Sequence, residues 1–274
     1  MDLGITGRVA VVSGGSKGQG LATAQVLLGE GCKVLIAART PETLEEARAQ
    51  LAAAAPGRVA AVAADMTDAG EVARVVAAAR RQFGPVDIAV SNVIGHTIDP
   101  DEAGVHAGYF GDTPTREYAK EFKQLLLSSW WLAREVIPDM KARRWGRILN
   151  IASGSAREPQ WEIPHILPNT VRPAVAALHR GLAEELSPFG ITVNNMLTGP
   201  VATQRNIDYY TWLARERGVS FDEMISTTYA RLPLRRPGKP EDMGHAIAFL
   251  CSEQARAISG QCMSVVGGRL RHVY

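Results

Sequence analysis

The sequence has few cysteines and no long apolar run. Its three cysteines, Cys32, Cys251 and Cys262, are odd in number and show no Cys-x-x-Cys spacing, which favours neither a disulfide framework nor a zinc cluster. No segment reaches the roughly 18 apolar residues of a membrane-spanning helix, and the N-terminal residues lack the pattern of a signal peptide. We therefore expect a cytoplasmic protein that binds no metal and does not enter a membrane.

The chain also lacks an excess of charge of either sign. Thirty lysines and arginines face 28 aspartates and glutamates, which leaves a formal net charge of +2. The adjacent arginines at 143–144 and 235–236 are isolated pairs rather than a basic stripe, so no nucleic-acid partner is expected. With 46% hydrophobic residues among 274, the chain can bury a large core without a disulfide or a metal.

Short apolar runs alternate with helical stretches along the chain. The runs are nearly continuous in apolar residues, as strands buried on both faces are. Alternating strands and helices predict an α/β fold with a parallel sheet, right-handed crossovers and helices on both faces. The expected strands are 8–13, 33–38, 58–64, 86–91, 147–153, 191–197 and 261–266, and the expected helices are 20–30, 41–54, 69–83, 115–140, 168–187 and 240–251.

No linker or internal repeat divides the chain, so residues 1–274 are expected to form one domain. Two stretches resist regular assignment. Residues 95–113 are polar and rich in glycine, and residues 200–238 carry weaker helical patterns between Pro200 and Pro237. Loops that follow the carboxyl ends of parallel strands border the ligand crevice of such a sheet, so we expect both stretches on the substrate side.

A glycine-rich segment, SGGSKGQG at 13–20, connects the first expected strand to the first expected helix. Glycines let the backbone approach a pyrophosphate, and the helix N-terminus offers free N–H groups and a positive dipole end. A tight turn between a strand and a helix would also need glycine for steric reasons alone. The flanking strand and helix favour the phosphate-binding interpretation.

The GxxxGxG spacing at 14–20 resembles the glycine motif of the short-chain dehydrogenase/reductase family, and further matches follow in order. Asp65-Met66 is similar to the family's Asp-hydrophobic pair near adenine, SNVIG at 91–95 resembles its NNAG segment, and TGPVAT at 198–203 resembles its PGxxxT motif. Residues 235–268 are similar to its C-terminal block. The resemblance implies a single doubly wound, Rossmann-type domain around a seven-stranded parallel sheet, with a cofactor half at about 1–150, and assembly as a homotetramer or dimer.

The resemblance also implies a nicotinamide cofactor. Arg39-Thr40 ends the second expected strand, where an acidic residue would hold the ribose 2′-hydroxyl of NAD(H). An arginine there would instead pair with a 2′-phosphate, and Lys17 adds a second positive charge. We therefore expect NADP(H), with NAD(H) as the alternative. The implied contacts fall on Gly14, Ser16, Lys17, Gly18, Gln19, Gly20, Arg39, Thr40, Asp65, Met66, Asn92, Gly95, Arg172 and Thr203.

The family's catalytic Asn-Ser-Tyr-Lys set is only partly present. Ser153 stands at a strand end as the family's serine does, although a serine there can also cap a turn. Counting along the resemblance places the tyrosine position on Pro168, the lysine position on Arg172 and the asparagine position on Leu125, and no Tyr-x-x-x-Lys occurs in the chain. Pro168 suits a first helical position. Arg172 can bind ribose hydroxyls but does not release a proton near neutral pH.

His165, three residues before Pro168, is the candidate for the missing proton donor. A neighbouring helix N-terminus would hold its pKa down, and a partly exposed loop histidine is the alternative. Tyr109, Tyr209 and Tyr210 are expected as walls of the substrate pocket. The spacing of His96, Asp99, Asp101 and His106 matches no metal motif, so those residues are expected in a polar loop.

Three functions remain open at this point. The first is an NADP(H)-dependent oxidoreductase that interconverts a carbonyl and a secondary alcohol on a small hydrophobic or aromatic substrate. Trp130, Trp131 and Trp161 are suitable contacts for such a substrate, although core packing explains the tryptophans of the expected helix equally well. The second is a non-redox enzyme on the same scaffold, an isomerase, dehydratase, lyase or dehalogenase that uses Ser153 and Arg172. The third is a nucleotide-binding protein without catalysis. A fold alone does not separate them.

Overall fold

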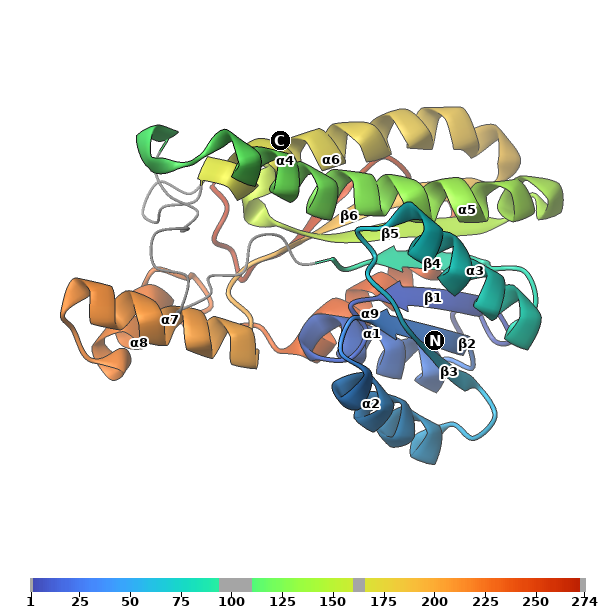
Figure 1. The fold of residues 1–274 in the computed structure, drawn as a ribbon, viewed down its shortest axis with the longest axis horizontal. Coiled ribbons are helices and arrows are strands. Elements are labelled where there is room, and N and C mark those ends of the chain that lie inside the picture. Colours follow the sequence, from blue (N-terminus) through green and yellow to red (C-terminus); the bar gives the residue numbers. More distant parts are fainter. Residues whose placement is uncertain (1, 94–109, 160–165, 272–274) are drawn as a thin grey trace.

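The computed structural model describes residues 2–93, 110–159 and 166–271, and they form a seven-stranded sheet flanked by helices (Figure 1). The strand order is β3-β2-β1-β4-β5-β6-β7, and each pair of neighbours is parallel. This confirms the predicted doubly wound fold. The strands are β1 (Val9–Ser13), β2 (Lys33–Ala38), β3 (Val59–Ala63), β4 (Ile88–Ser91), β5 (Gly146–Ser153), β6 (Ile191–Thr198) and β7 (Cys262–Val265).

Helices cover both faces of the sheet because successive residues of each strand point to opposite sides. In β1, Ala10 and Val12 pack into the core on one face, and Val9 and Val11 pack into the core on the other. The first core is covered by α1 (Gly18–Gly29), α2 (Pro41–Ala54) and α9 (Pro240–Cys251), and the second by α3 (Ala69–Phe83), α5 (Ser128–Arg143) and α6 (Ile166–Leu186).

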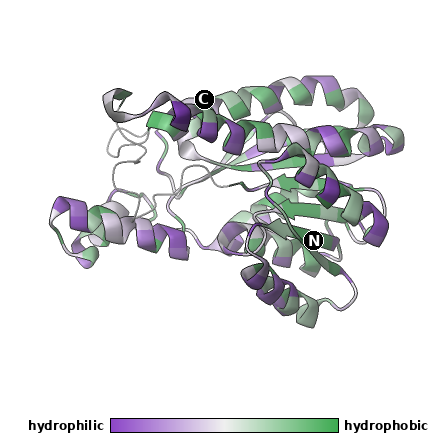
Figure 2. Ribbon diagram, in the orientation of Figure 1, coloured by the Kyte–Doolittle hydropathy of each residue, from purple (hydrophilic) through white to green (hydrophobic). Residues whose placement is uncertain are grey.

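The hydropathy of the chain follows these layers. In Figure 2 hydrophobic residues fill the strands of the sheet, whereas the helices that cover it alternate hydrophilic and hydrophobic residues. Helix α3 illustrates how the local sequence forms a helix. Asp68 caps its N-terminus by accepting a hydrogen bond from the backbone N–H of Glu71 at 3.0 Å. Its buried face consists of Val72, Val75, Val76 and Ala79. No described helix is long and apolar enough to cross a membrane.

The helices on the α5–α6 face contain irregular turns. Helix α4 (Thr115–Phe122) continues through a π-helical turn, Lys123–Leu127, into α5. Helix α6 begins at Ile166, so the expectation that Pro168 occupies the first helical position is wrong by two residues. The first-turn N–H groups of a helix have no intrahelical acceptor, so a proline is tolerated there. Pro173, in contrast, lies in the helix interior.

Two more helices occupy the segment 200–238, where only weak helical patterns were expected. They are α7 (Gln204–Arg217) and α8 (Phe221–Ala230), and Figure 1 shows them set apart from the sheet. Leu213, Ala214 and Met224 form a small core between them, against which Tyr209 and Tyr210 pack. The segment therefore forms a small unit of its own beside the carboxyl ends of the strands.

Candidate functional site

The glycine turn between β1 and α1 is built by close backbone approach. Gly14 and Gly18 have φ angles of +60° and +54°, which favour glycine. Asn92 donates from its side-chain amide to the carbonyl oxygen of Gly14 at 3.1 Å. A Cβ at Gly20 would lie 2.2 Å from that same carbonyl oxygen and 2.5 Å from Nδ2 of Asn92. Glycine is therefore required where the helix N-terminus meets the turn.

A cavity of about 230 Å³ opens beside this turn. It connects the turn to the ends of β2 and β3, which lie side by side in the sheet. Its predicted cofactor residues are Gly14, Ser16, Lys17, Arg39, Thr40, Asp65, Met66 and Asn92, which the fold brings together from four separate segments. The lining residues that the sequence analysis missed are Ala38, Thr43, Ala64, Thr67, Val93 and Gln124.

The two basic residues of the cavity stand at its rim. The side chains of Lys17 and Arg39 are exposed, and Lys17 is the residue that precedes the first turn of α1. Asp65 is held differently, because its Oδ1 accepts a hydrogen bond from the backbone N–H of Thr67 at 2.9 Å. The cavity thus combines a helix N-terminus, two positive side chains and one fixed carboxylate.

The N-terminus of α7 lies against the glycine turn. A Cβ at Gly18 would lie 3.4 Å from the methyl carbon of Thr203, which is ordinary van der Waals distance. Thr203 caps α7, because its hydroxyl accepts a hydrogen bond from the backbone N–H of Asn206 at 3.3 Å. The predicted contact residue Thr203 is therefore placed beside the turn. The predicted cofactor residues that are described but do not line the cavity are Gly18, Gln19, Gly20, Arg172 and Thr203.

Ser153 ends β5 and is linked to Arg172 through a second serine. The Ser153 side chain is 9% exposed, and its hydroxyl accepts a hydrogen bond from the backbone N–H of Ser155 at 3.4 Å. Nη1 of Arg172, on α6, donates to the hydroxyl oxygen of Ser155 at 3.0 Å. The structure thus brings Ser153 and Arg172 to the same strand end. The sequence offered no signal for Ser155 beyond its place two residues after Ser153.

Two further charged residues, Glu121 and Arg205, interact electrostatically with Arg172, and neither was predicted from the sequence. Burial lowers the pKa of Arg172, against the effect of the Glu121 carboxylate on α4. Glu121 is 1% exposed. Arg205, at the start of α7, is exposed; partial desolvation and then the positive charge of Arg172 lower its pKa, whereas Glu121 acts in the opposite direction. Three helices therefore bring two arginines and a carboxylate within electrostatic reach of one another.

The positions that replace the missing catalytic residues are apolar in the structure. Pro168 is buried near the start of α6, and Leu125 lies within the π-helical turn. Neither side chain carries a proton that could be transferred. His165, Gly95, Tyr109, Trp161 and the loop residues His96, Asp99, Asp101 and His106 lie outside the described residues, so their predicted roles stay predictions.

The remaining aromatic candidates are placed away from the cavity. Trp131 packs against the core under α5 and α3, and Trp130 is 42% exposed. Neither lines the cavity at the glycine turn. The rings of Tyr209 and Tyr210 contact edge to face with centroids 5.4 Å apart, and burial, with the Tyr229 phenol contributing less, raises the pKa of Tyr210 to about 12. Its phenol is therefore protonated at neutral pH.

All three cysteines are free thiols, as an odd, widely spaced set suggests. Among the residues that the structure describes, no group of three or more histidine, cysteine, aspartate or glutamate side chains is arranged to hold a metal ion.

Comparison with known proteins places the chain among oxidoreductases. The family model described as enoyl-(acyl carrier protein) reductase matches residues 4–269. The chain is 30% identical to the uncharacterized oxidoreductase YvrD of Bacillus subtilis over 99% of both chains. It is 30% identical to dehydrogenase/reductase SDR family member 4 of Sus scrofa over 95% of this chain and 86% of the relative. The crystal structure of L-sorbose reductase from Gluconobacter frateurii, complexed with NADPH and L-sorbose, superposes with a TM-score of 0.90 at 30% identity and covers 100% of both chains.

Proposed function

The chain belongs to the short-chain dehydrogenase/reductase family, and on that premise we propose that it is an NADP(H)-dependent oxidoreductase that interconverts a carbonyl group and a secondary alcohol. The observation that carries the proposal is the cavity in which Arg39 and Lys17 stand beside the glycine turn. A guanidinium group pairs with a phosphate in two parallel hydrogen bonds, so Arg39 suits the 2′-phosphate of NADP(H). The NADPH complex of L-sorbose reductase supports the same cofactor.

The residues at the turn fit such a cofactor. The space that a Cβ at Gly20 would fill is occupied by the carbonyl oxygen of Gly14, so the backbone is compact where a pyrophosphate would meet the N-terminus of α1. Asp65 and Met66 would lie at the adenine, and Thr203 at the nicotinamide end. When bound, the nicotinamide supplies or accepts a hydride.

The chain's own residues would position the substrate and move the proton. Ser153 would donate a hydrogen bond to the substrate oxygen and polarise it. Arg172 would hold the ribose hydroxyls, because its guanidinium stays charged. His165 would carry the proton that the missing tyrosine cannot. The proposed substrate is a small hydrophobic or aromatic carbonyl compound.

A second candidate function is a non-redox reaction on the same scaffold. The observation that favours it is the apolar character of Pro168 and Leu125, which leaves no phenol at the tyrosine position. A nucleotide-binding protein without catalysis is the third candidate. Under the second or third candidate, no carbonyl compound would be reduced at the expense of NADPH. Assembly as a homotetramer or dimer and a cytoplasmic location stay predictions.

The proposal is tested by titrating the protein with NADPH and NADH while following tryptophan quenching. We expect tighter binding of NADPH, and in Arg39→Ala we expect the NADPH dissociation constant to rise by about tenfold or more while that of NADH changes little. Arg48→Ala is the matched control, because the side chain of Arg48 on α2 is 38% exposed and pairs with Glu45 at 2.6 Å.

The outcome of this titration separates the candidates. Equal affinity for both cofactors would remove the assignment of Arg39 to the 2′-phosphate. Absence of binding of either would overturn the redox proposal. Where NADPH binds, its consumption in the presence of a panel of ketones and aldehydes distinguishes an oxidoreductase from the two other candidates.

A further inference from the structure

The cavity beside the glycine turn has an apolar part as well as a charged one. Lys17 and Arg39 stand exposed at its rim. Met66, which also lines the cavity, is buried in the core under α3 and α5, and Val93 packs against that same core. A flat aromatic ring is stabilised when it leaves water and lies against apolar side chains. The apolar part of the cavity therefore suits a nucleotide base.

Gln124 contributes a side-chain amide to this cavity from the helices on the α5–α6 face. It lines the cavity and belongs to the π-helical turn Lys123–Leu127, which joins α4 to α5. Turns of this kind are rare and are frequent at functional sites. The hydroxyl of Ser128 donates to the backbone carbonyl oxygen of Gln124 at 2.5 Å, which helps to hold the turn in place. The amide is thus presented to the cavity by an anchored segment of backbone.

The side-chain oxygen of Gln124, Oε1, is buried, and within residues 2–93, 110–159 and 166–271 no hydrogen-bond donor reaches it. An acceptor that is hidden from water costs free energy until a donor pairs with it. Asp65 lines the same cavity but differs, because it is exposed and its Oδ1 already accepts from the backbone N–H of Thr67 at 2.9 Å. A ligand therefore gains more by donating to Gln124 than by donating to Asp65.

We propose that Gln124 determines the base specificity of the cofactor site: its Oε1 accepts a hydrogen bond from the 6-amino group of adenine, and its Nε2 donates to N7 of the same base. A carboxamide matches this edge of adenine, which presents a donor beside an acceptor. Adenine is the base expected near Arg39, because the adenosine ribose carries the 2′-phosphate of NADP(H). The inference rests on the proposed function, since the base belongs to that cofactor.

The test compares NADPH with its deamino analogue, in which hypoxanthine replaces adenine. The analogue presents an acceptor oxygen where NADPH presents the 6-amino group, so the amide of Gln124 cannot pair with both atoms of that edge. Both compounds carry the same reduced nicotinamide, and tryptophan quenching gives the dissociation constant of each. We expect the wild-type protein to bind NADPH about tenfold more tightly than the analogue.

Gln124→Leu removes the amide and keeps a side chain of similar size. We expect its dissociation constant for NADPH to rise about tenfold and its preference for NADPH over the analogue to fall to about twofold or less. The urea midpoint of the cofactor-free variant should not fall, because no described donor loses its partner. Gln82→Leu is the matched control, since Gln82 is exposed on α3, and it should bind both compounds as the wild type does.

Several results would overturn the inference and leave the proposed function standing. They are equal binding of NADPH and the analogue by the wild type, a tenfold preference that persists in Gln124→Leu, and a urea midpoint that falls in Gln124→Leu but not in Gln82→Leu. A preference that is lost in Asp65→Asn and kept in Gln124→Leu would assign the recognition of adenine to Asp65 instead. If neither NADPH nor NADH binds, the proposed function fails and this inference fails with it, a result that differs from all of these.

Discussion

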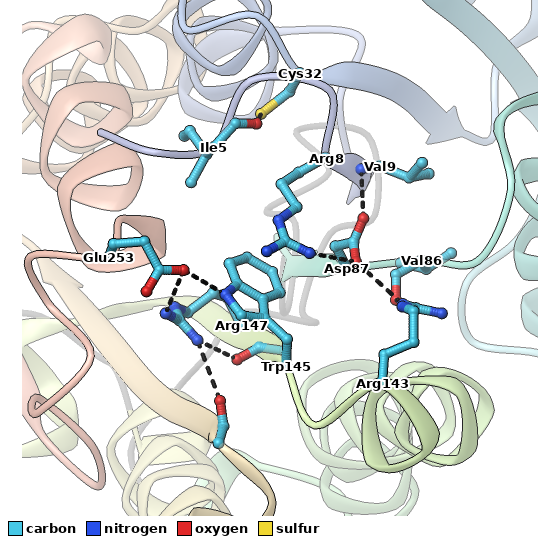
Figure 3. A network of polar contacts seen from close by, with 12 residues as sticks. Ile5, Arg8, Val9, Cys32, Val86, Asp87, Arg143, Trp145, Arg147 and Glu253 are labelled. Atoms are coloured by element: carbon cyan, nitrogen blue, oxygen red, sulfur yellow. Dashed lines mark hydrogen bonds and ion pairs between the residues drawn. The ribbon is translucent and has the colours of Figure 1, made fainter. Parts of the chain in front are cut away.

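The two ends of the parallel sheet both gather arginines, and they hold them differently. At the amino ends of the strands, the guanidinium groups of Arg8 and Arg147 stack on the ring of Trp145, with Cζ 3.7 Å and 4.3 Å from the ring centroid (Figure 3). Arg147 is 1% exposed, and its Nη1 donates to the carbonyl oxygen of Gly146 at 2.9 Å. Glu253 accepts from the indole of Trp145 and lies 3.8 Å from Nη2 of Arg147.

Asp87 completes this network on the neighbouring strands. Its Oδ1 lies 3.1 Å from Nη2 of Arg143 and 3.4 Å from Nη1 of Arg8, and its Oδ2 accepts from the backbone N–H of Val9 at 2.9 Å (Figure 3). The cations of this end are therefore matched by carboxylates, carbonyl groups and an aromatic ring of the same chain. Such a network contributes to stability and offers little to a ligand.

The basic residues at the carboxyl ends of the strands are placed differently. There Lys17 and Arg39 stand exposed at the rim of a cavity, and Arg172 donates to the hydroxyl oxygen of Ser155 at 3.0 Å. The comparison teaches that a basic side chain at the rim of a cavity is accessible to a ligand, whereas one held by carboxylates, carbonyl groups and a ring of the same chain is occupied by the fold. It also separates the expected consequences of mutation, because a change at the amino ends should affect folding and a change at the carboxyl ends should affect binding.

The largest effect is expected for Arg147→Ala. Removing this buried arginine takes a donor from the carbonyl oxygens of Gly146, Gly190 and Ser252 and leaves a cavity, so the free energy of unfolding should fall by about 3–5 kcal/mol. Urea denaturation followed by tryptophan fluorescence measures the change, and the NADPH dissociation constant of the folded variant should stay within about twofold of the wild type. A variant that keeps the wild-type free energy of unfolding but no longer binds NADPH would contradict this contrast between the two ends of the sheet.

Two controls accompany Arg147→Ala. Arg147→Met keeps much of the buried volume without the charge, and we expect it to lose less stability than the alanine variant. Arg180→Ala removes an exposed ion pair, in which Arg180 is 58% exposed and lies 3.0 Å from Glu184, and should cost less than about 0.5 kcal/mol. A loss in Arg147→Ala no larger than that in Arg180→Ala would contradict the structural role of the network.

Gly20→Ala tests the opposite end of the sheet. The added Cβ would collide with the carbonyl oxygen of Gly14 and the side-chain amide of Asn92, and the turn must shift to accommodate it. We expect the NADPH dissociation constant to rise about a hundredfold, which corresponds to about 3 kcal/mol of binding free energy. Gly29→Ala is the matched control, since it lies in the same helix and an added Cβ meets no atom within 4 Å. Equal NADPH affinity in both variants would contradict the conclusion that the turn requires glycine at position 20.

Part of this contrast could be predicted from the sequence. The strands and the glycine turn are encoded by neighbouring residues: apolar runs such as 33–38 have no polar interruption beyond Lys33, and the spacing at 14–20 permits few conformations. Because parallel strands end at a common edge, the prediction also brought Arg39, Asp65 and Asn92 to one place. Local sequence patterns were sufficient to predict which residues lie together wherever the order of the strands alone brings them together.

Contacts between distant helices were not predictable in this way. The segment TREYAKEF of α4 has the composition of an exposed helix, yet Glu117 and Glu121, four residues apart on one face, are 6% and 1% exposed. Helix α4 packs against α6, whose residues lie tens of positions later in the chain. The amino-end network has the same origin, since Arg8 meets Asp87 only after the strands pair. The local sequence around each of these residues does not indicate which distant residue it will contact.

The smallest effect concerns a buried histidine on α6, between the two ends. Nε2 of His179 lies 2.8 Å from the hydroxyl oxygen of Ser129 on α5, and burial lowers the pKa of His179 to about 4, a shift that the nearby Asn195 and Asn194 reduce. The unfolded chain therefore binds a proton between about pH 6.5 and 4 that the folded chain does not. This contribution to stability is complete above pH 6.5 and is lost as the pH falls.

Between pH 7 and 5 this histidine alone should remove about 2 kcal/mol of the free energy of unfolding. His179→Gln keeps a hydrogen-bonding group near Ser129 and cannot titrate, so its stability should fall less than that of the wild type over the same range, as measured by urea denaturation at each pH. His245→Gln, which replaces an exposed histidine on α9, is the matched control and should follow the wild type. Parallel curves for wild type and His179→Gln would show that the buried histidine does not govern the acid sensitivity of the α5–α6 face.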